Sequence, residues 1–175
     1  FNKAQIVDKE GQTRPLVAKE EKIVVTGKTP ADFVSGGITP MQSASLLLIL
    51  VAGISIYGIR RGKTLWGIDL ILFLIAGIAG CILAFLALFS QHPAVSPNYI
   101  LFVFHPFHLF CLPFMLSRVR KREISRYMLV NFAVLTLFIG LWTIIPQRIP
   151  PAVLPLALCL LIRSASNLIL TYKRK

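Results

Sequence analysis

Acidic residues are scarce in this sequence: 7 Asp and Glu stand against 19 Lys and Arg among 175 residues, which gives a net charge of +12. Such an excess can indicate nucleic-acid binding, but the positions of the charges argue against it. Eleven basic residues lie in three short segments, 60–63, 118–126 and 173–175, each beside a hydrophobic run. This placement is typical of the cytoplasmic loops of membrane proteins, and we therefore expect no nucleic-acid partner.

Cysteine is also rare, and its spacing excludes a disulfide framework. The 3 cysteines, Cys81, Cys111 and Cys159, each stand in an apolar run, and no two of them form a CxxC motif. Unpaired cysteines in apolar surroundings usually act as small hydrophobic side chains. We expect that role here.

Hydrophobic residues are abundant, at 55% of the chain with a mean hydropathy of +0.72. They come in runs of roughly twenty, the length that crosses a bilayer as a helix. The expected spans are residues 41–59, 65–89, 98–116, 127–145 and 152–172. Eleven basic residues fall on one face and only Arg148 in the two opposite loops. The sequence thus predicts an all-α membrane protein, a bundle of five transmembrane helices with the N-terminus out and the C-terminus in.

Residues 1–40 are polar and contain alternating pieces with turn signals, which predict one or two short strands and a linker. About forty residues are too few to bury a core of their own. We expect this extended segment to pack on another domain or on the membrane surface, separate from the helical domain of residues 41–175. Because no export signal precedes it, we expect the chain to be the C-terminal part of a longer protein.

One polar layer is predicted near the basic face. Counting 1.5 Å per residue from the basic flanks places Asp69, Asn131 and Asn167 roughly 8 to 9 Å inside the membrane. Arg163 precedes Asn167 by four residues and so lies one turn deeper on the same side. Since Asp69 is the only acid in a predicted span, we expect an Asp69–Arg163 pair, with Asn131, Ser166 and Asn167 completing its hydrogen bonds. The pair could fix helix packing or belong to a proton or ion path.

A second polar layer is predicted at the opposite face, where all 3 histidines lie. It comprises His92, Asn98, Tyr99, His105 and His108. His105 and His108 share a helix face, and Pro106 between them favours a kink. A metal site with His92 is conceivable, but no carboxylate at that depth completes it, so we predict no metal and no cofactor.

Two further roles for this layer remain. His108 could form a dyad with Cys111 three residues later, but Cys111 would lie in the inner half without positive charge to favour its thiolate. Recognition of lipid headgroups or of a peptide amine fits better, and an interfacial belt of aromatic and polar residues is the plain alternative.

The sequence contains three distinctive stretches: FSQHPAVSPNYILFVFHPFHL (89–109), IVDKEGQTRPLV (6–17) and PLALCLLIRSASNLIL (155–170). Each resembles a part of the Lnb lipoprotein N-acyltransferases of Bacteroidota. The first resembles their His-containing loop with the following apolar run. The second is similar to the strand that closes their periplasmic domain, and the third to their last helix. The resemblance implies a multi-pass protein of the bacterial inner membrane with a periplasmic N-terminus.

The resemblance also implies an activity that this chain does not carry by itself. Lnb-type proteins have a periplasmic domain with a catalytic Cys and His, and they transfer an acyl chain from a phospholipid to the N-terminal amine of diacylated lipoproteins. The expected partners are membrane lipids, a diacylated lipoprotein and that upstream domain, and we expect no catalytic residue here. The alternatives are a non-enzymatic membrane anchor or assembly subunit and, more weakly, a small transporter, although no internal repeat is evident.

Overall fold

The computed structural model describes residues 5–7, 12–15, 37–89 and 98–173 of two compact units, Phe1–Gly37 and Ile38–Lys175. In the first unit, strands β1 (Gln5–Val7) and β2 (Thr13–Pro15) form an antiparallel pair in whose backbone register Ile6 pairs with Arg14. These strands lie where the alternating sequence predicts extended segments.

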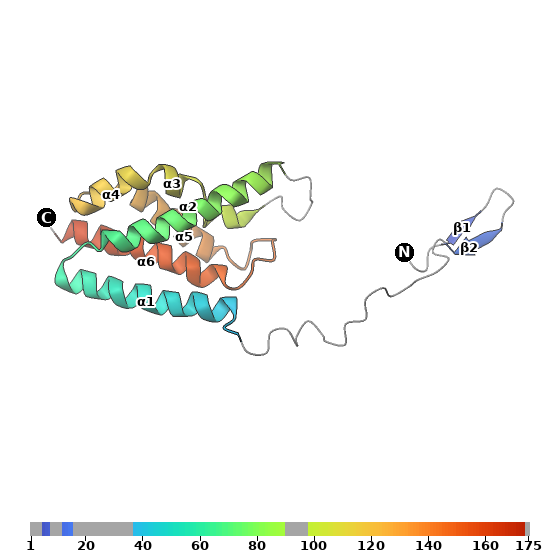
Figure 1. Ribbon diagram of the computed structural model, residues 1–175, viewed down its shortest axis with the longest axis horizontal. Coiled ribbons are helices and arrows are strands. Elements are labelled where there is room, and N and C mark those ends of the chain that lie inside the picture. Colours follow the sequence, from blue (N-terminus) through green and yellow to red (C-terminus); the bar gives the residue numbers. More distant parts are fainter. Residues whose placement is uncertain (1–4, 8–11, 16–36, 90–97, 174–175) are drawn as a thin grey trace. The chain divides into compact units, whose positions relative to one another are not determined.

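The described part of the second unit is all helical (Figure 1). Its elements are α1 (Pro40–Arg61), α2 (Trp66–Phe89), the 3₁₀ helix η2 (Tyr99–Phe102), α3 (Phe107–Phe110), α4 (Leu112–Arg120), α5 (Arg126–Gly140) and α6 (Val153–Tyr172). Local chemistry sets the ends of α1. Thr39 and Gln42 form a reciprocal capping box ahead of the first turn, and Gly62 ends the helix in the left-handed conformation at φ 60°.

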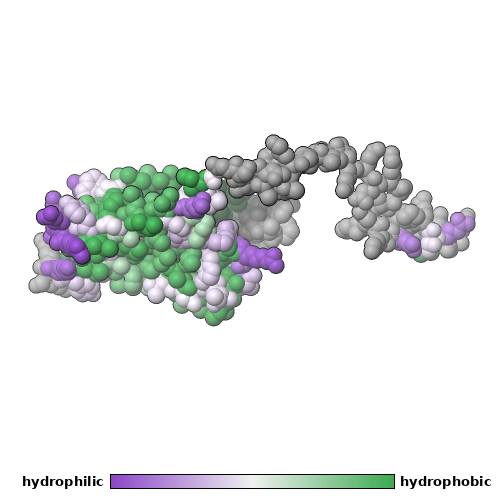
Figure 2. Space-filling view, turned by 90° about the horizontal axis from the view of Figure 1, so that it is seen from below, coloured by the Kyte–Doolittle hydropathy of each residue, from purple (hydrophilic) through white to green (hydrophobic). Residues whose placement is uncertain are grey.

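This unit is a multi-pass membrane domain by the length and apolarity of its helices. α1, α2 and α6 are each long and apolar enough to cross a bilayer. Large apolar side chains cover the outer surfaces of α1 and α2, with Ile49 69% and Ile75 61% exposed. Figure 2 shows apolar residues spread over most of the visible face of this unit. Exposed apolar surface on this scale suits contact with lipid rather than water.

The third predicted span is not the single kinked helix expected for residues 98–116. The chain forms η2, α3 and α4 instead, and the direction changes by 77° between Tyr99–Phe110 and Leu112–Arg120. We call residues 99–120 the broken segment. Pro106 and Pro113 explain the break, because neither has the backbone N–H that a continuous helix needs. Helix α5 also ends at Gly140, whereas the predicted span continues to residue 145. The described residues therefore give three unbroken spans, or four with the broken one, and a shorter apolar helix α5.

Two glycines on α2 allow the broken segment to approach closely. A methyl group added at Gly80 would lie 2.5 Å from the His105 carbonyl carbon, and one at Gly77 would lie 2.6 Å from the Leu109 backbone nitrogen. Helix α2 packs on α3 and α4, while α6 lies at the centre of the unit against α1 and α5 (Figure 1). The broken segment is thus held on α2, on the other side of the bundle from α1.

The three basic segments meet at one end of the unit. The Arg122 guanidinium donates a hydrogen bond to the Gly62 carbonyl, joining the α4–α5 turn to the α1–α2 turn. The Thr171 hydroxyl, near the end of α6, donates to the Asn167 carbonyl at 2.9 Å and also lies 3.5 Å from the Glu123 carbonyl. We call this region, formed by residues 60–63, 118–126 and 173, the basic end.

Candidate functional site

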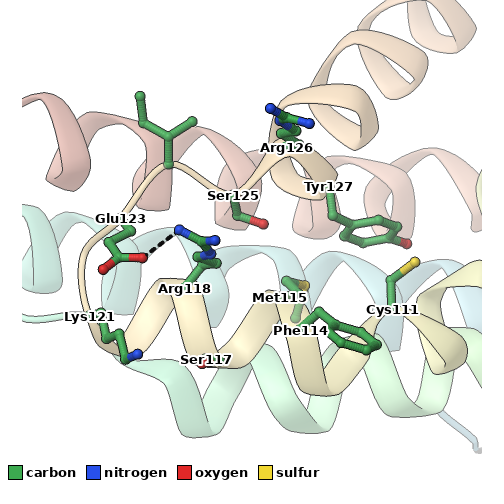
Figure 3. A pocket seen from close by; sticks show the side chains of 11 residues that line it. Cys111, Phe114, Met115, Ser117, Arg118, Lys121, Glu123, Ser125, Arg126 and Tyr127 are labelled. Atoms are coloured by element: carbon green, nitrogen blue, oxygen red, sulfur yellow. Dashed lines mark hydrogen bonds and ion pairs between the residues drawn. The ribbon is translucent and has the colours of Figure 1, made fainter.

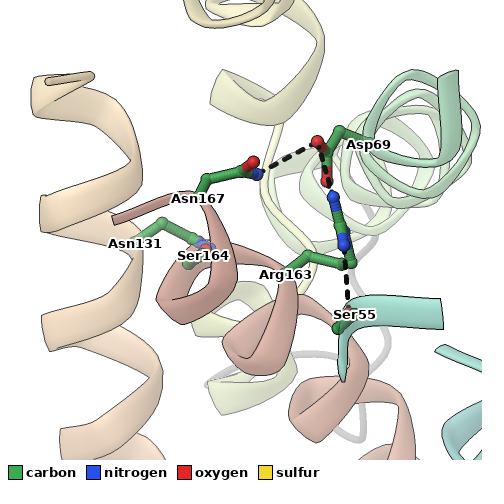
Figure 4. A network of polar contacts seen from close by, with 6 residues as sticks. All are labelled: Ser55, Asp69, Asn131, Arg163, Ser164 and Asn167. Carbon is green, nitrogen blue, oxygen red and sulfur yellow. Dashed lines mark hydrogen bonds and ion pairs between the residues drawn. The ribbon is translucent and has the colours of Figure 1, made fainter. Parts of the chain in front are cut away.

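A fully buried ion pair joins α2 to α6 (Figure 4). Arg163 Nε donates to Asp69 Oδ1 at 2.7 Å and Nη2 donates to Oδ2 at 3.0 Å, which is a bidentate geometry. The third nitrogen, Nη1, donates to the Ser55 hydroxyl at 3.0 Å. The two charged side chains are only 1% and 0% exposed. Every guanidinium nitrogen is therefore bonded, and the pair links three helices.

The two asparagines predicted to complete this cluster, Asn131 and Asn167, make different contacts. Asn167 Nδ2 donates to Asp69 Oδ2 at 3.0 Å and so belongs to the ion pair. Asn131 Nδ2 instead donates to the Ser164 hydroxyl at 2.9 Å, a bond between α5 and α6. Within the described residues, the Ser166 hydroxyl has no hydrogen-bond partner. The structure thus brings Asp69, Arg163 and Asn167 together and places Asn131 in a separate contact.

His105 and His108 form a stacked pair, with ring centroids 3.9 Å apart and an interplanar angle of 16°. His108 is fully buried, and both of its ring nitrogens have partners. Nε2 lies 2.9 Å from the Val103 carbonyl, and Nδ1 lies 2.6 Å from the Tyr127 hydroxyl. A carbonyl can only accept, so we assign the proton to Nε2 and let Nδ1 accept from Tyr127. Because both nitrogens are occupied in this way, His108 does not form a dyad with Cys111.

His105 differs from its neighbour because one of its ring nitrogens is unused. His105 Nδ1 is buried without a hydrogen-bond partner in the described part of the chain, and so is Asn131 Oδ1. Both residues line a mostly apolar cleft of about 600 Å³ between the broken segment and α5, together with Phe102, Phe107 and Val134. We call this the apolar cleft. Buried polar atoms without partners are rare in native proteins, so these two atoms single out the residues beside this cleft.

The other predicted outer residues have local roles or lie outside the described residues. The Asn98 side chain caps η2 by accepting from the Ile100 N–H at 3.1 Å. The Tyr99 N–H donates to Gln147 Oε1 at 2.7 Å, which ties the start of the broken segment to the loop after α5. His92 lies outside the described residues. Groups of three or more His, Cys, Asp or Glu side chains able to hold a metal are absent from the described ranges.

Comparison with protein families decides the identity of this domain. Residues 32–175, most of the chain, match the family model of the Lnb transmembrane domain. The chain belongs to this family. Searches of curated proteins and of solved structures find no significant match.

A second, larger cleft of about 1090 Å³ opens at the basic end of this Lnb domain, between α4 and the start of α5 (Figure 3). Its walls carry the basic residues Arg118, Lys121 and Arg126 and one acid, Glu123. We call it the basic cleft. It shares Cys111, Arg126 and Tyr127 with the apolar cleft, so the two volumes adjoin.

Three side chains that take part in the Lnb domain's polar contacts, Ser55, Tyr127 and Ser164, were not predicted from the sequence. Ser55 lies in an apolar run of α1, where a hydroxyl gives no sign of the partner it will meet. Tyr127 stands at the start of a span, where tyrosine is typical of the membrane interface rather than of a buried contact. Ser164 was detectable in principle, because it precedes Asn167 by three residues and so shares its helix face.

Proposed function

We propose that this chain is the membrane part of an Lnb-type lipoprotein N-acyltransferase. Family membership over residues 32–175 is the observation that carries the proposal. The bonds of the reaction are made and broken in an upstream periplasmic domain with a Cys and a His, which transfers an acyl chain from a phospholipid to the N-terminal amine of a diacylated lipoprotein. The membrane domain holds that catalytic domain at the outer leaflet and helps to admit its lipid substrates.

The position of the charges supports the orientation in this proposal. The three basic segments lie together at the basic end. Arg148, in contrast, lies in the loop between α5 and α6. By the positive-inside rule the basic end faces the cytoplasm. The N-terminal unit is then periplasmic, and the domain lies in the bacterial inner membrane.

The apolar cleft supports the part of the proposal that concerns substrates. Its walls are mostly aromatic and aliphatic, which suits an acyl chain, and His105 and Asn131 beside it each have a buried polar atom without a partner among the described residues. The stacking of His105 on His108, and the bond from His108 to Tyr127, hold the His105 ring in place. In the proposal His105 contacts the polar part of a lipid substrate and takes no covalent role.

The test is N-acylation of a diacylated lipoprotein by the full-length protein carrying His105→Leu, which keeps a side chain of similar size and removes the ring nitrogens. Losing one hydrogen bond of about 1 kcal/mol should lower kcat/KM about fivefold. Thr136→Val on α5 is the matched control, because that hydroxyl donates only within its own helix, to the Phe132 carbonyl. It should keep full turnover.

The same experiment separates the proposal from its alternative. If His105→Leu acylates lipoprotein as fast as the unaltered protein, the domain serves as a non-enzymatic anchor or assembly subunit whose polar residues only pack helices. The fraction of folded protein, followed by thermal unfolding in detergent, must be equal for both variants. A His105 variant that folds normally and loses turnover supports substrate admission.

A further inference from the structure

The basic cleft and the apolar cleft adjoin, and we call the two together the α4–α5 groove. The basic cleft lies between α4 and the start of α5, and the apolar cleft lies between η2, α3 and α5. α4 packs on α2, and α5 packs on α6 and touches η2, so the space between α4 and α5 stays open. The two parts have volumes of about 1090 and 600 Å³. Pockets for drug-sized ligands measure about 300 to 1,000 Å³, so the groove has room for a larger, elongated molecule.

The mouth of this α4–α5 groove is positively charged. Three basic side chains line it against the single acid Glu123. Arg118 Nη1 contacts Glu123 Oε2 at 2.7 Å, but the side chains are 61% and 43% exposed, and an exposed pair of this kind contributes little. In the described segments the Arg126 guanidinium has neither a hydrogen-bond nor an ion-pair partner, and it borders both clefts. Arginine suits a phosphate because its fork can donate two parallel hydrogen bonds.

The wall of the groove beyond the mouth suits hydrocarbon. Phe114 on α4 and Phe107 on α3 are 77% and 65% exposed, and each lines one of the clefts. Val130 on α5 lines the apolar cleft together with Phe107 and is 59% exposed. A soluble anion would use only the charged mouth and leave these walls uncovered. A lipid would match both parts, with its charged group at the surface and its chain inside.

We propose that the α4–α5 groove binds an anionic phospholipid, with its phosphate at Arg118 and Arg126 and an acyl chain running past Phe114 towards Val130. This lipid belongs to the leaflet at the basic end. It is therefore a resident lipid rather than the acyl donor of the proposed reaction. Its chain enters the apolar cleft from the basic end, so that cleft serves both this lipid and the substrate of the proposed function. The test measures retained lipid instead of acylation, so the two proposals can fail separately.

The test is native mass spectrometry of the full-length protein in detergent with added phosphatidylglycerol, phosphatidylcholine or glycerol 1-phosphate. The unaltered protein should retain phosphatidylglycerol in preference to phosphatidylcholine. Arg118→Gln with Arg126→Gln should weaken retention about 30-fold, since each cationic side chain near a membrane surface contributes about fivefold. Arg60→Gln with Arg61→Gln, at the same end but outside the groove, should leave retention unchanged.

A second pair of variants tests the chain-binding part. Val130→Trp should fill the apolar wall and lower phosphatidylglycerol retention, whereas Leu137→Trp, on the same helix, 63% exposed and not a lining residue, should not. Equal retention of the two phospholipids would overturn the proposal, as would equal losses in both Arg pairs. Displacement of lipid by glycerol 1-phosphate, or no effect of Val130→Trp, would reduce the site to a surface anion site and also overturn it.

Discussion

Removing one member of the Asp69–Arg163 pair should strongly destabilise the domain. Asp69 is fully buried and accepts bonds from Arg163 Nε, Arg163 Nη2 and Asn167 Nδ2. Asp69→Leu leaves the guanidinium without its counter-ion in an apolar interior. Breaking a buried pair in this way costs about 3 to 5 kcal/mol of unfolding free energy. Arg163→Met should cost a similar amount, because it strands the carboxylate.

The double variant Asp69→Leu with Arg163→Met decides whether the cost comes from the unpaired charge. Replacing both charges by apolar groups removes the desolvation penalty along with the attraction, so the double variant should lie within about 2 kcal/mol of the unaltered domain. Its stability should thus exceed that of either single variant. Such non-additivity measures the coupling of the two residues.

The assay is reversible unfolding in mixed micelles, followed by helical circular dichroism as the share of denaturing detergent rises. Arg148→Gln, an exposed arginine in the loop between α5 and α6, is the control and should change stability by no more than about 0.5 kcal/mol. Single variants within about 1 kcal/mol of the unaltered domain would refute the reasoning. A double variant less stable than both single ones would refute it as well.

Two further changes probe the broken segment by the same unfolding assay. Gly80→Ala should cost about 1 to 3 kcal/mol, since the added methyl group meets the His105 backbone at 2.5 Å. Gly53→Ala is the control, because a methyl group added at Gly53 meets no atom within 4 Å, and it should not lower the free energy of unfolding. Equal effects of the two substitutions would contradict the close packing at Gly80. Tyr127→Phe should cost about 1 to 3 kcal/mol by leaving His108 Nδ1 unpaired. The ¹⁵N resonance of His108 Nδ1 should also shift in this variant, and an unshifted resonance would contradict the bond assigned between Tyr127 and His108.

The long helices could be predicted because their apolar runs are continuous and bounded by charge or by Pro and Gly. The predicted ends of α1, α2 and α6 agree with the structure to within two residues. The third span could not be predicted in the same way. Its apolar run is equally continuous, and a proline announces a disturbance without giving its size. The bent segment packs its backbone against Gly77 and Gly80 of α2, and this contact between distant residues becomes visible only in the folded structure.

Among the polar contacts, too, some could be predicted from the sequence and others could not. Asp69 and Arg163 stood out because each is the only residue of its charge within the predicted spans, and depth counting placed them one turn apart. The structure joins them directly. The bond between His108 and Tyr127 gave no such signal, because it connects residues whose side chains have several ordinary uses in a membrane. The sequence also did not indicate that the buried ring nitrogen without a partner would belong to His105 and not to His108.

The shortness of α5 has a consequence for the surrounding bilayer. Fifteen helical residues rise roughly 22 Å, against a hydrocarbon core of about 30 Å. A span shorter than the core is accommodated by thinning of the bilayer, by flanking side chains that reach the interface, or by association with other helices. Thinning would bring the two leaflets closer together beside the α4–α5 groove.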